Sequence, residues 1–234
     1  MSTPETGRVL LVNPNTNRAT TEMMRALAAR SLHASGLAVD GITAAAGPSM
    51  IVDPVALTES ESHVRDAVLR ALDAAEEGGR RYLAVIVAAI GDPGRSQLDD
   101  ELDLPVVGIG QAAILAAGQA GRRFGMATST PLLVDSLAAR VAEHRMSQGF
   151  TGVRLTESEP LVLAADPERQ FAELAAAVDQ CTEADGADAV IIAGGPLSET
   201  ARRIADSRTC EIVEPIPSAA RQVLQELRLS GLTV

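Results

Sequence analysis

The fold class follows from a pattern that residues 8–33 show first: RVLLVNPNTNRATTEMMRALAARSLH. The apolar run VLLV predicts a buried strand, and the polar turn NPNTN that follows is typical of a strand end. Beyond the turn, apolar residues recur at helical spacing, which predicts an amphipathic helix. A strand, a polar turn and a helix in this order form the repeating unit of α/β proteins.

The same unit recurs along the whole chain. Short apolar runs predict strands at residues 8–12, 37–43, 83–89, 105–109, 124–128, 152–156, 189–193 and 211–214. Amphipathic segments predict helices at residues 17–33, 59–77, 132–146, 168–183 and 218–229. Several of the strands are almost uniformly hydrophobic, as is typical of parallel sheets that helices cover on both faces. We therefore expect an α/β fold with mainly parallel sheets, either as two joined lobes or as one doubly wound sheet.

The composition restricts both partners and compartment. The 234 residues carry a formal net charge of −11, and 2% of them are aromatic. Nucleic-acid backbones and anionic membranes require clustered cations, and base stacking requires aromatic rings, so we expect no nucleic-acid and no membrane partner. The chain has no apolar run of roughly 18 residues, and its N-terminus lacks a signal-peptide pattern, so we expect a cytoplasmic protein.

Several cofactor classes are excluded by residue types. The chain contains no lysine, which both a pyridoxal phosphate Schiff base and a Walker A phosphate loop require. Cys181 and Cys210 form no CxxC motif, and Cys181 falls on the apolar face of a predicted helix. His33, His63 and His144 are scattered along helical segments. We therefore expect no cofactor and no metal site.

Polar or glycine-rich turns follow four of the predicted strands, at the edge where open α/β sheets bind ligands. These turns are NPNTN (13–17), IGDPG (90–94), TSTP (128–131) and GGPLSE (194–199). Each has an ordinary structural explanation. Thr16 or Asn17, the hydroxyls of TSTP, and Ser198 or Glu199 could cap the helices that follow, and Asp92 could form a turn. Each also offers amide, hydroxyl or backbone N–H groups to a small polar ligand.

Six motifs in series resemble the aspartate/glutamate racemase superfamily and, within it, the hydantoin and allantoin racemase branch. They are VNPNTN (12–17), GPS (47–49), GDPG (91–94), PVVGIG (105–110), FGMATST (124–130) and DAVIIAGGPLSE (188–199). The resemblance covers nearly the whole chain. It implies two pseudo-symmetric lobes with a ligand cleft between them: lobe 1 at residues 1–110 plus 210–234, and lobe 2 at residues 111–209. It also implies a homo-oligomer with a small-molecule substrate.

The resemblance further implies which residues form the site. Substrate binding falls, by motif matching, on the side chains of Asn13, Asn15, Thr128 and Ser129 and on the backbone around Gly91, Gly195 and Pro196. Racemases of the family use two cysteines, one from each lobe, on opposite faces of the substrate's α-carbon. This sequence has Ala89 and Gly194 at those two positions. Both positions therefore lack a thiol, and neither a methyl group nor a hydrogen atom can take up a proton.

The sequence leaves several explanations open. Ala89 could be an engineered replacement of a cysteine. A single cysteine there, facing the glycine at position 194, would make a one-base or nucleophilic variant of the racemase. Another group could serve as the base, with Asp92 nearest the empty position and Glu199, Glu214 and His63 as further candidates. The family-level expectation is a cofactor-independent racemase or epimerase of a small ureide- or amino-acid-like substrate. Hydrolysis or isomerisation of a small amide, imide or diacid, and ligand binding without catalysis, are the alternatives.

Overall fold

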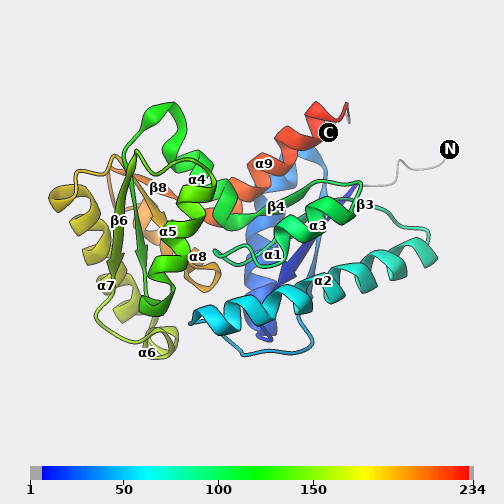
Figure 1. Cartoon of the computed structure of the whole chain (residues 1–234), viewed down its shortest axis with the longest axis horizontal. Coiled ribbons are helices and arrows are strands. Elements are labelled where there is room, and N and C mark those ends of the chain that lie inside the picture. The colour runs from blue at the N-terminus through cyan, green and yellow to red at the C-terminus, as the bar shows by residue number, and fades with distance from the viewer. Residues whose placement is uncertain (1–6, 232–234) are drawn as a thin grey trace.

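Two four-stranded sheets form the two lobes of the molecule, and neighbouring strands in both are parallel (Figure 1). The computed structural model describes residues 7–231. The first sheet, in the order β2-β1-β3-β4, consists of β1 (Arg8–Asn13), β2 (Ala38–Thr43), β3 (Tyr82–Val87) and β4 (Val106–Gly108). The second, in the order β6-β5-β7-β8, consists of β5 (Phe124–Thr128), β6 (Phe150–Leu155), β7 (Ala189–Ile192) and β8 (Glu211–Val213). The repeated order confirms the expected α/β fold of two pseudo-symmetric lobes.

The uniformly apolar strands are buried on both faces, as their sequences predict. In β1, Val9 and Leu11 pack into one hydrophobic cluster, while Leu10 and Val12 pack into another on the opposite face of the sheet. All four side chains are completely buried. Successive side chains of a strand point to opposite faces, so a strand between two helical layers must be apolar at every position.

Helices cover both faces of each sheet. In lobe 1, α1 (Arg18–Leu32) and α9 (Pro215–Leu229) pack on one face, and α2 (Pro54–Glu77) and α3 (Arg95–Glu101) pack on the other. In lobe 2, α5 (Val134–Glu143) covers one face, and α7 (Pro167–Asp179) and α8 (Ser198–Ala205) cover the other. The short helix α6 (Pro160–Ala165) packs on α7.

Helix α4 (Ile109–Gly118) joins the lobes and belongs to both cores. Ile109 and Ala112 pack into the core of lobe 1, while Ala113 and Ile114 pack into the core of lobe 2. No helix is predicted here from the sequence, because a segment that is apolar on every side lacks amphipathic periodicity.

The chain returns to lobe 1 later than the sequence suggests. Strand β8 pairs with β7 in the second sheet, and α9 then packs on α1 and α4. The expected division, which assigns residues 210–234 to lobe 1, therefore differs from the structure at residues 211–213. The reason is physical: the short run EIV completes the second sheet before the chain crosses over.

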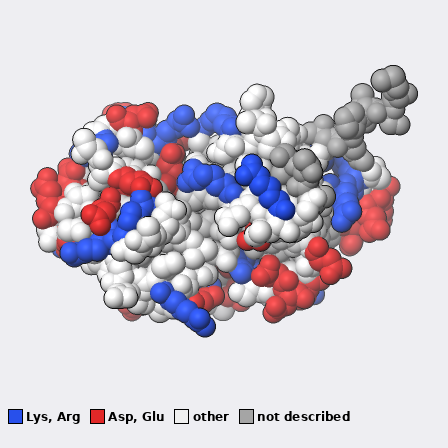
Figure 2. All heavy atoms as spheres, turned by 90° about the horizontal axis from the view of Figure 1, so that it is seen from above, with Lys and Arg blue, Asp and Glu red and all other residues white. Residues whose placement is uncertain are grey.

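The surface carries both signs of charge. On the face shown in Figure 2, acidic side chains gather toward the two ends and arginine side chains lie between them. Within residues 7–231, none of the helices combines the length and the apolar content needed to span a bilayer.

Candidate functional site

A cavity of about 320 Å³ lies between the lobes, at the carboxyl ends of strands from both sheets. Its walls include residues that directly follow four strands: Asn15 and Asn17 after β1, residues 88–91 after β3, residues 128–130 at the end of β5, and residues 193–197 after β7. This edge of a parallel sheet is where ligands bind in α/β proteins. The volume is within the usual range for small-molecule sites.

Most of the predicted site residues line this cavity: Asn15, Ala89, Gly91, Thr128, Ser129, Gly194, Gly195 and Pro196. Two predicted residues, Asn13 and Asp92, are buried and do not belong to the lining. The structure therefore brings Ala89 and Gly194 together in one cavity, along with the polar turns of both lobes.

Asn13 stabilises the turn after β1 and is not part of the cavity wall. Its Nδ2 donates to Asn15 Oδ1 and to Thr21 Oγ1, both at 2.9 Å, and to the backbone oxygen of Asn17 at 3.1 Å. Its Oδ1 accepts from the backbone N–H of Asn15 at 3.2 Å. Direct ligand contact was the role expected for Asn13; its amide is instead used within the protein, and the residue positions Asn15.

Asn15 and Ser129 present polar atoms from opposite lobes to the cavity. Asn15 Oδ1 accepts from Asn13 and from the backbone N–H of Asn17, while its Nδ2 donates to no acceptor among residues 7–231. The Ser129 hydroxyl likewise makes no hydrogen bond within the described part of the chain. An amide N–H₂ and a free hydroxyl are suited to a carbonyl or carboxylate oxygen.

Thr128 lines the cavity but uses its hydroxyl to fix the wall. Its Oγ1 donates to the backbone oxygen of Ala193 at 2.8 Å and lies 3.0 Å from Thr130 Oγ1. The first of these bonds ties the ends of β5 and β7 together. It holds the residue directly before Gly194 in place.

Ala89 and Gly194 lie on loops that approach each other closely. A Cβ added to Gly195 would lie 3.1 Å from the Ala88 carbonyl oxygen, so the loop of lobe 2 nearly touches the loop that carries Ala89. A Cβ added to Gly194 would lie 3.1 Å from two carbons of Leu197. An added side chain at position 194 would therefore require the Leu197 side chain to shift by a few tenths of an ångström.

Asp92 fastens the turn after β3 to the start of α4. Its two carboxylate oxygens accept from the backbone N–H groups of Gly110, at 2.8 Å, and Gln111, at 2.6 Å. A Cβ at Gly108 would lie 2.2 Å from Asp92 Cγ, so the glycine of the PVVGIG motif leaves room for this carboxylate. Burial raises the pKa of Asp92 to about 7, although both hydrogen bonds lower it. Asp92 does not reach the cavity, which removes the geometric basis for its hypothesised role as the base.

Two other candidate bases are also distant from the lining. Glu214 lies directly before α9 and is half-buried, and burial raises the pKa of its carboxyl group. His63 lies on α2 beneath the loop after β2, and a Cβ on Gly47 would be 3.2 Å from its Nδ1. Neither side chain lines the cavity.

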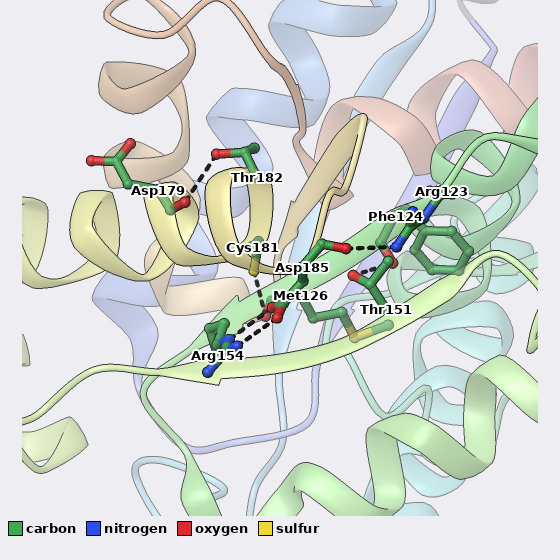
Figure 3. A network of polar contacts seen from close by, with 9 residues as sticks. All are labelled: Arg123, Phe124, Met126, Thr151, Arg154, Asp179, Cys181, Thr182 and Asp185. Carbon is green, nitrogen blue, oxygen red and sulfur yellow. Dashed lines mark hydrogen bonds and ion pairs between the residues drawn. The ribbon is translucent and has the colours of Figure 1, made fainter.

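The two cysteines are structural. Cys181 is completely buried in the core of lobe 2, where its Sγ lies 3.5 Å from the Met126 carbonyl oxygen (Figure 3). The Arg154–Asp185 ion pair lies beside it. Burial raises the pKa of the Cys181 thiol to about 12, so it stays protonated at neutral pH. Cys210 is half-buried, also with a raised pKa, and neither cysteine lines the cavity.

A second group of lining residues has little or no signal in the sequence, apart from Glu199, which the sequence names as a candidate base. Met50 and Ile51 come from the loop after β2, Leu57 comes from α2, and Pro160, Leu163, Ala164, Pro167, Gln170, Glu199, Thr200 and Arg203 come from α6, α7 and α8. The GPS motif marks the loop after β2, whereas nothing in the sequence places α6 at the site. Apolar side chains dominate this part of the wall, which suits an aliphatic portion of a ligand.

The cavity has few charged groups. Glu199 and Arg203 are the lining residues with ionisable side chains. Among residues 7–231 no group of three or more His, Cys, Asp or Glu side chains is arranged to hold a metal ion.

Comparison with known proteins places this geometry in a family. Residues 9–223 match the family model described as Asp/Glu/Hydantoin racemase. The hydantoin racemase of Paenarthrobacter aurescens is 25% identical over 214 residues, which are 92% of this chain and 88% of that protein. The allantoin racemase structures from Klebsiella pneumoniae and Pseudomonas fluorescens have TM-scores of 0.85 and 0.84, at 22% and 24% identity. Both alignments cover 97% of this chain, with 89% and 92% of the respective relatives. The chain, with its two matching lobes and its cavity between them, belongs to the Asp/Glu/hydantoin racemase family.

Proposed function

We propose that this protein binds a small ureide- or amino-acid-like molecule in the cavity between its lobes and removes and returns a proton at the carbon next to a carbonyl group, the step that racemases and epimerases share. The observation that carries the proposal is the cavity itself, at the carboxyl ends of both sheets. It joins the unused donors of Asn15 and Ser129 with the two family positions, Ala89 and Gly194. The names of the relatives, hydantoin racemase and allantoin racemase, support a cyclic ureide as the first ligand to test.

The polar groups suit such a ring. A cyclic ureide is planar and has carbonyl oxygens that accept hydrogen bonds and N–H groups that donate them. Asn15 Nδ2 can donate to a carbonyl oxygen, and the Ser129 hydroxyl can donate or accept. Removal of the neighbouring C–H proton places negative charge on that carbonyl oxygen, so donors aimed at it would stabilise the transition state.

Binding without catalysis is the second candidate, and a specific observation favours it. Ala89 supplies only a methyl group, and Gly194 has no side chain. Two-thiol chemistry is therefore closed to this chain as it stands, and proton transfer needs a different group.

Proton NMR in D₂O separates the two candidates. Hydantoins, allantoin and free amino acids are each incubated with the wild-type protein, with Ala89→Cys, and with Ala19→Cys as a control that adds a thiol on the exposed face of α1. The proposal predicts loss of the α-proton signal with the wild-type protein for at least one ureide. Exchange with Ala89→Cys alone, or calorimetric binding without any exchange, would support the binding protein instead. Neither binding nor exchange across the panel would contradict the proposed function.

A further inference from the structure

Among residues 7–231, the cavity wall contains one carboxylate side chain. Its ionisable side chains are Glu199 and Arg203, and a guanidinium group has donors but no acceptor. The other polar lining residues carry amides or hydroxyls, which are poor bases. Asp92, Glu214 and Cys181, the neighbouring titratable groups, do not reach the lining.

Glu199 is free to act on a ligand. It lies in the first turn of α8, five residues after Gly194, with an exposed side chain. Its carboxylate makes no ion pair and no hydrogen bond with any side chain in residues 7–231. A glutamate of this kind would ordinarily pair with an arginine four residues later on the same helix face.

Arg203, at that position, is held by other groups. Its guanidinium donates to Glu168 at 3.0 Å and lies 4.5 Å from the centre of the Phe171 ring. Contacts of this type stabilise a guanidinium and orient its plane. The Arg203 cation is thus directed to Glu168 and Phe171 on α7, while Glu199, also a lining residue, has no side-chain partner among residues 7–231.

We propose that Glu199 is the general base of this site and that its chemistry, resting on the proposed function above, is one-base proton transfer. The Glu199 carboxylate takes the proton from the carbon next to a carbonyl group of the ligand. The electron pair of the broken C–H bond moves toward the carbonyl carbon as the C=O pair shifts onto oxygen, which gives an enolate. The amide of Asn15 and the hydroxyl of Ser129 donate to that oxygen. The carboxylic acid so formed returns the proton, or a deuteron gained by exchange with D₂O.

The stereochemical outcome follows from the number of bases. Inversion in a single step needs a second group on the opposite face of the carbon, and the remaining cavity wall at Ala89 and Gly194 has neither thiol nor carboxylate. One carboxylate serves one face, so exchange proceeds with retention of configuration. The substrate class that such a site can convert is one in which a proton moves between two atoms on the same face, as in the shift of a double bond next to a carbonyl group.

An experiment with single enantiomers tests both the role of Glu199 and the predicted retention of configuration. Each enantiomer of 5-methylhydantoin is incubated in D₂O with the wild-type protein; proton NMR follows the α-proton signal, and chiral chromatography follows the enantiomer. The proposal predicts deuterium uptake at least about ten times faster than inversion. In Glu199→Gln, exchange should fall by roughly 100-fold or more, the usual contribution of a general base. Glu199→Asp should retain part of the rate, and calorimetry should show that Glu199→Gln still binds 5-methylhydantoin.

Glu159→Gln is the matched control, because Glu159 is exposed directly beside the lining residue Pro160 and is not itself part of the lining. Its exchange rate should stay within about twofold of the wild-type rate. Equal rates of exchange and inversion, or exchange that survives in Glu199→Gln, would overturn the assignment of Glu199 while leaving the proposed function intact. Binding without exchange in the wild-type protein would overturn the assignment and support the non-catalytic binder. Absence of binding would remove both proposals together.

Discussion

Asn13 and Asn15 stand two positions apart in one turn and have different tasks. Asn13 is completely buried and uses both ends of its amide within the protein. Asn15 anchors its oxygen in the same network and keeps its Nδ2 for the cavity. The sequence could not separate the two roles, because both are amides at the end of one strand. Only the direction in which each side chain leaves the backbone distinguishes a positioning residue from a ligand-binding one.

Replacement of Asn13 by alanine should therefore weaken both stability and binding. The change leaves Asn15 Oδ1 and Thr21 Oγ1 with one hydrogen-bond partner fewer in a buried turn. We expect a loss of about 1–3 kcal/mol in the free energy of unfolding, measured by urea denaturation, and weaker ureide binding in calorimetry. Ser129→Ala is the comparison: it should weaken binding with a stability change under about 0.5 kcal/mol. Unchanged binding in Asn13→Ala would mean that the turn does not depend on this amide.

The Asp92 carboxyl group should make stability depend on pH. Its pKa is raised by burial from 3.8 to about 7, so the folded state binds a proton more tightly than the unfolded state does. Its contribution is therefore complete below pH 3.8 and is lost as the pH rises to about 7. Urea denaturation between these limits should show Asp92→Asn gaining stability relative to the wild-type protein as the pH rises. A stability difference that stays constant across this range would contradict the raised pKa.

At the scale of single elements, α6 is the part of the wall with the least support of its own. It has six residues and supplies Pro160, Leu163 and Ala164 to the cavity. The segment before it is held by Glu173 on α7, which accepts from the Ser158 backbone N–H at 2.8 Å and from its hydroxyl at 2.7 Å. These two bonds, together with the smaller effect of the Arg169 ion pair, lower the pKa of Glu173 to about 2.

Loss of this anchor should loosen α6 without unfolding the lobe. In Glu173→Gln the hydrogen bonds to Ser158 lose their charged acceptor, so we expect faster amide hydrogen exchange over residues 156–166 and weaker ligand binding. Arg169→Gln removes the neighbouring ion pair but keeps both Ser158 bonds, and should have a smaller effect. In the wild-type protein the same segment should loosen as the pH falls from 4.5 toward 2, where Glu173 becomes protonated. Exchange in this segment that is indifferent to Glu173 would contradict the anchor.

The elements that the sequence predicts well are those with strong periodicity. Each predicted strand is present within about two residues, and α1, α5, α7 and α9 follow from their amphipathic patterns. The prediction misses α3, α6 and α8, which have fewer than nine residues and begin in proline- or glycine-rich turns. It also begins α2 five residues late, because Asp53 and Pro54 resemble a loop until Asp53 is seen to cap the helix through the backbone N–H of Ala56.

The site residues also divide into those that the sequence predicts and those that it does not. Ala89, Gly194 and the turns around them could be placed in one cleft, because parallel strands end at one edge and the motifs occur in family order. The contributions of Arg203 and of α6 could not be predicted from the sequence, because they depend on how the helices of lobe 2 pack. Glu199 could be named only as one candidate base among several; the cavity lining then separates it from Asp92 and Glu214.

For the whole molecule, the cavity depends on how closely the two lobes approach each other. Helix α4 packs in both cores, and Gly195 lies against lobe 1, where an added Cβ would be 2.8 Å from Met24 Sδ and 3.1 Å from the Ala88 oxygen. We expect Gly195→Ala to lower the free energy of unfolding by about 1–3 kcal/mol and to weaken ligand binding, because the lobes must separate slightly. Gly194→Ala contacts the Leu197 side chain, which can rotate, and should cost less. Thermal denaturation measures the stability of the two variants, and calorimetry measures their ligand binding. Equal effects of Gly195→Ala and Gly194→Ala would contradict this view of the lobe contact.

A crystal structure of the wild-type protein with hydantoin or allantoin at saturating concentration would decide whether the cavity between the lobes is the ligand site. We predict the ring in the cavity, with one carbonyl oxygen within about 3.2 Å of Asn15 Nδ2 or of the Ser129 hydroxyl, and with a ring carbon facing Glu199. A ligand bound elsewhere on the molecule, with this cavity unoccupied, would contradict the account.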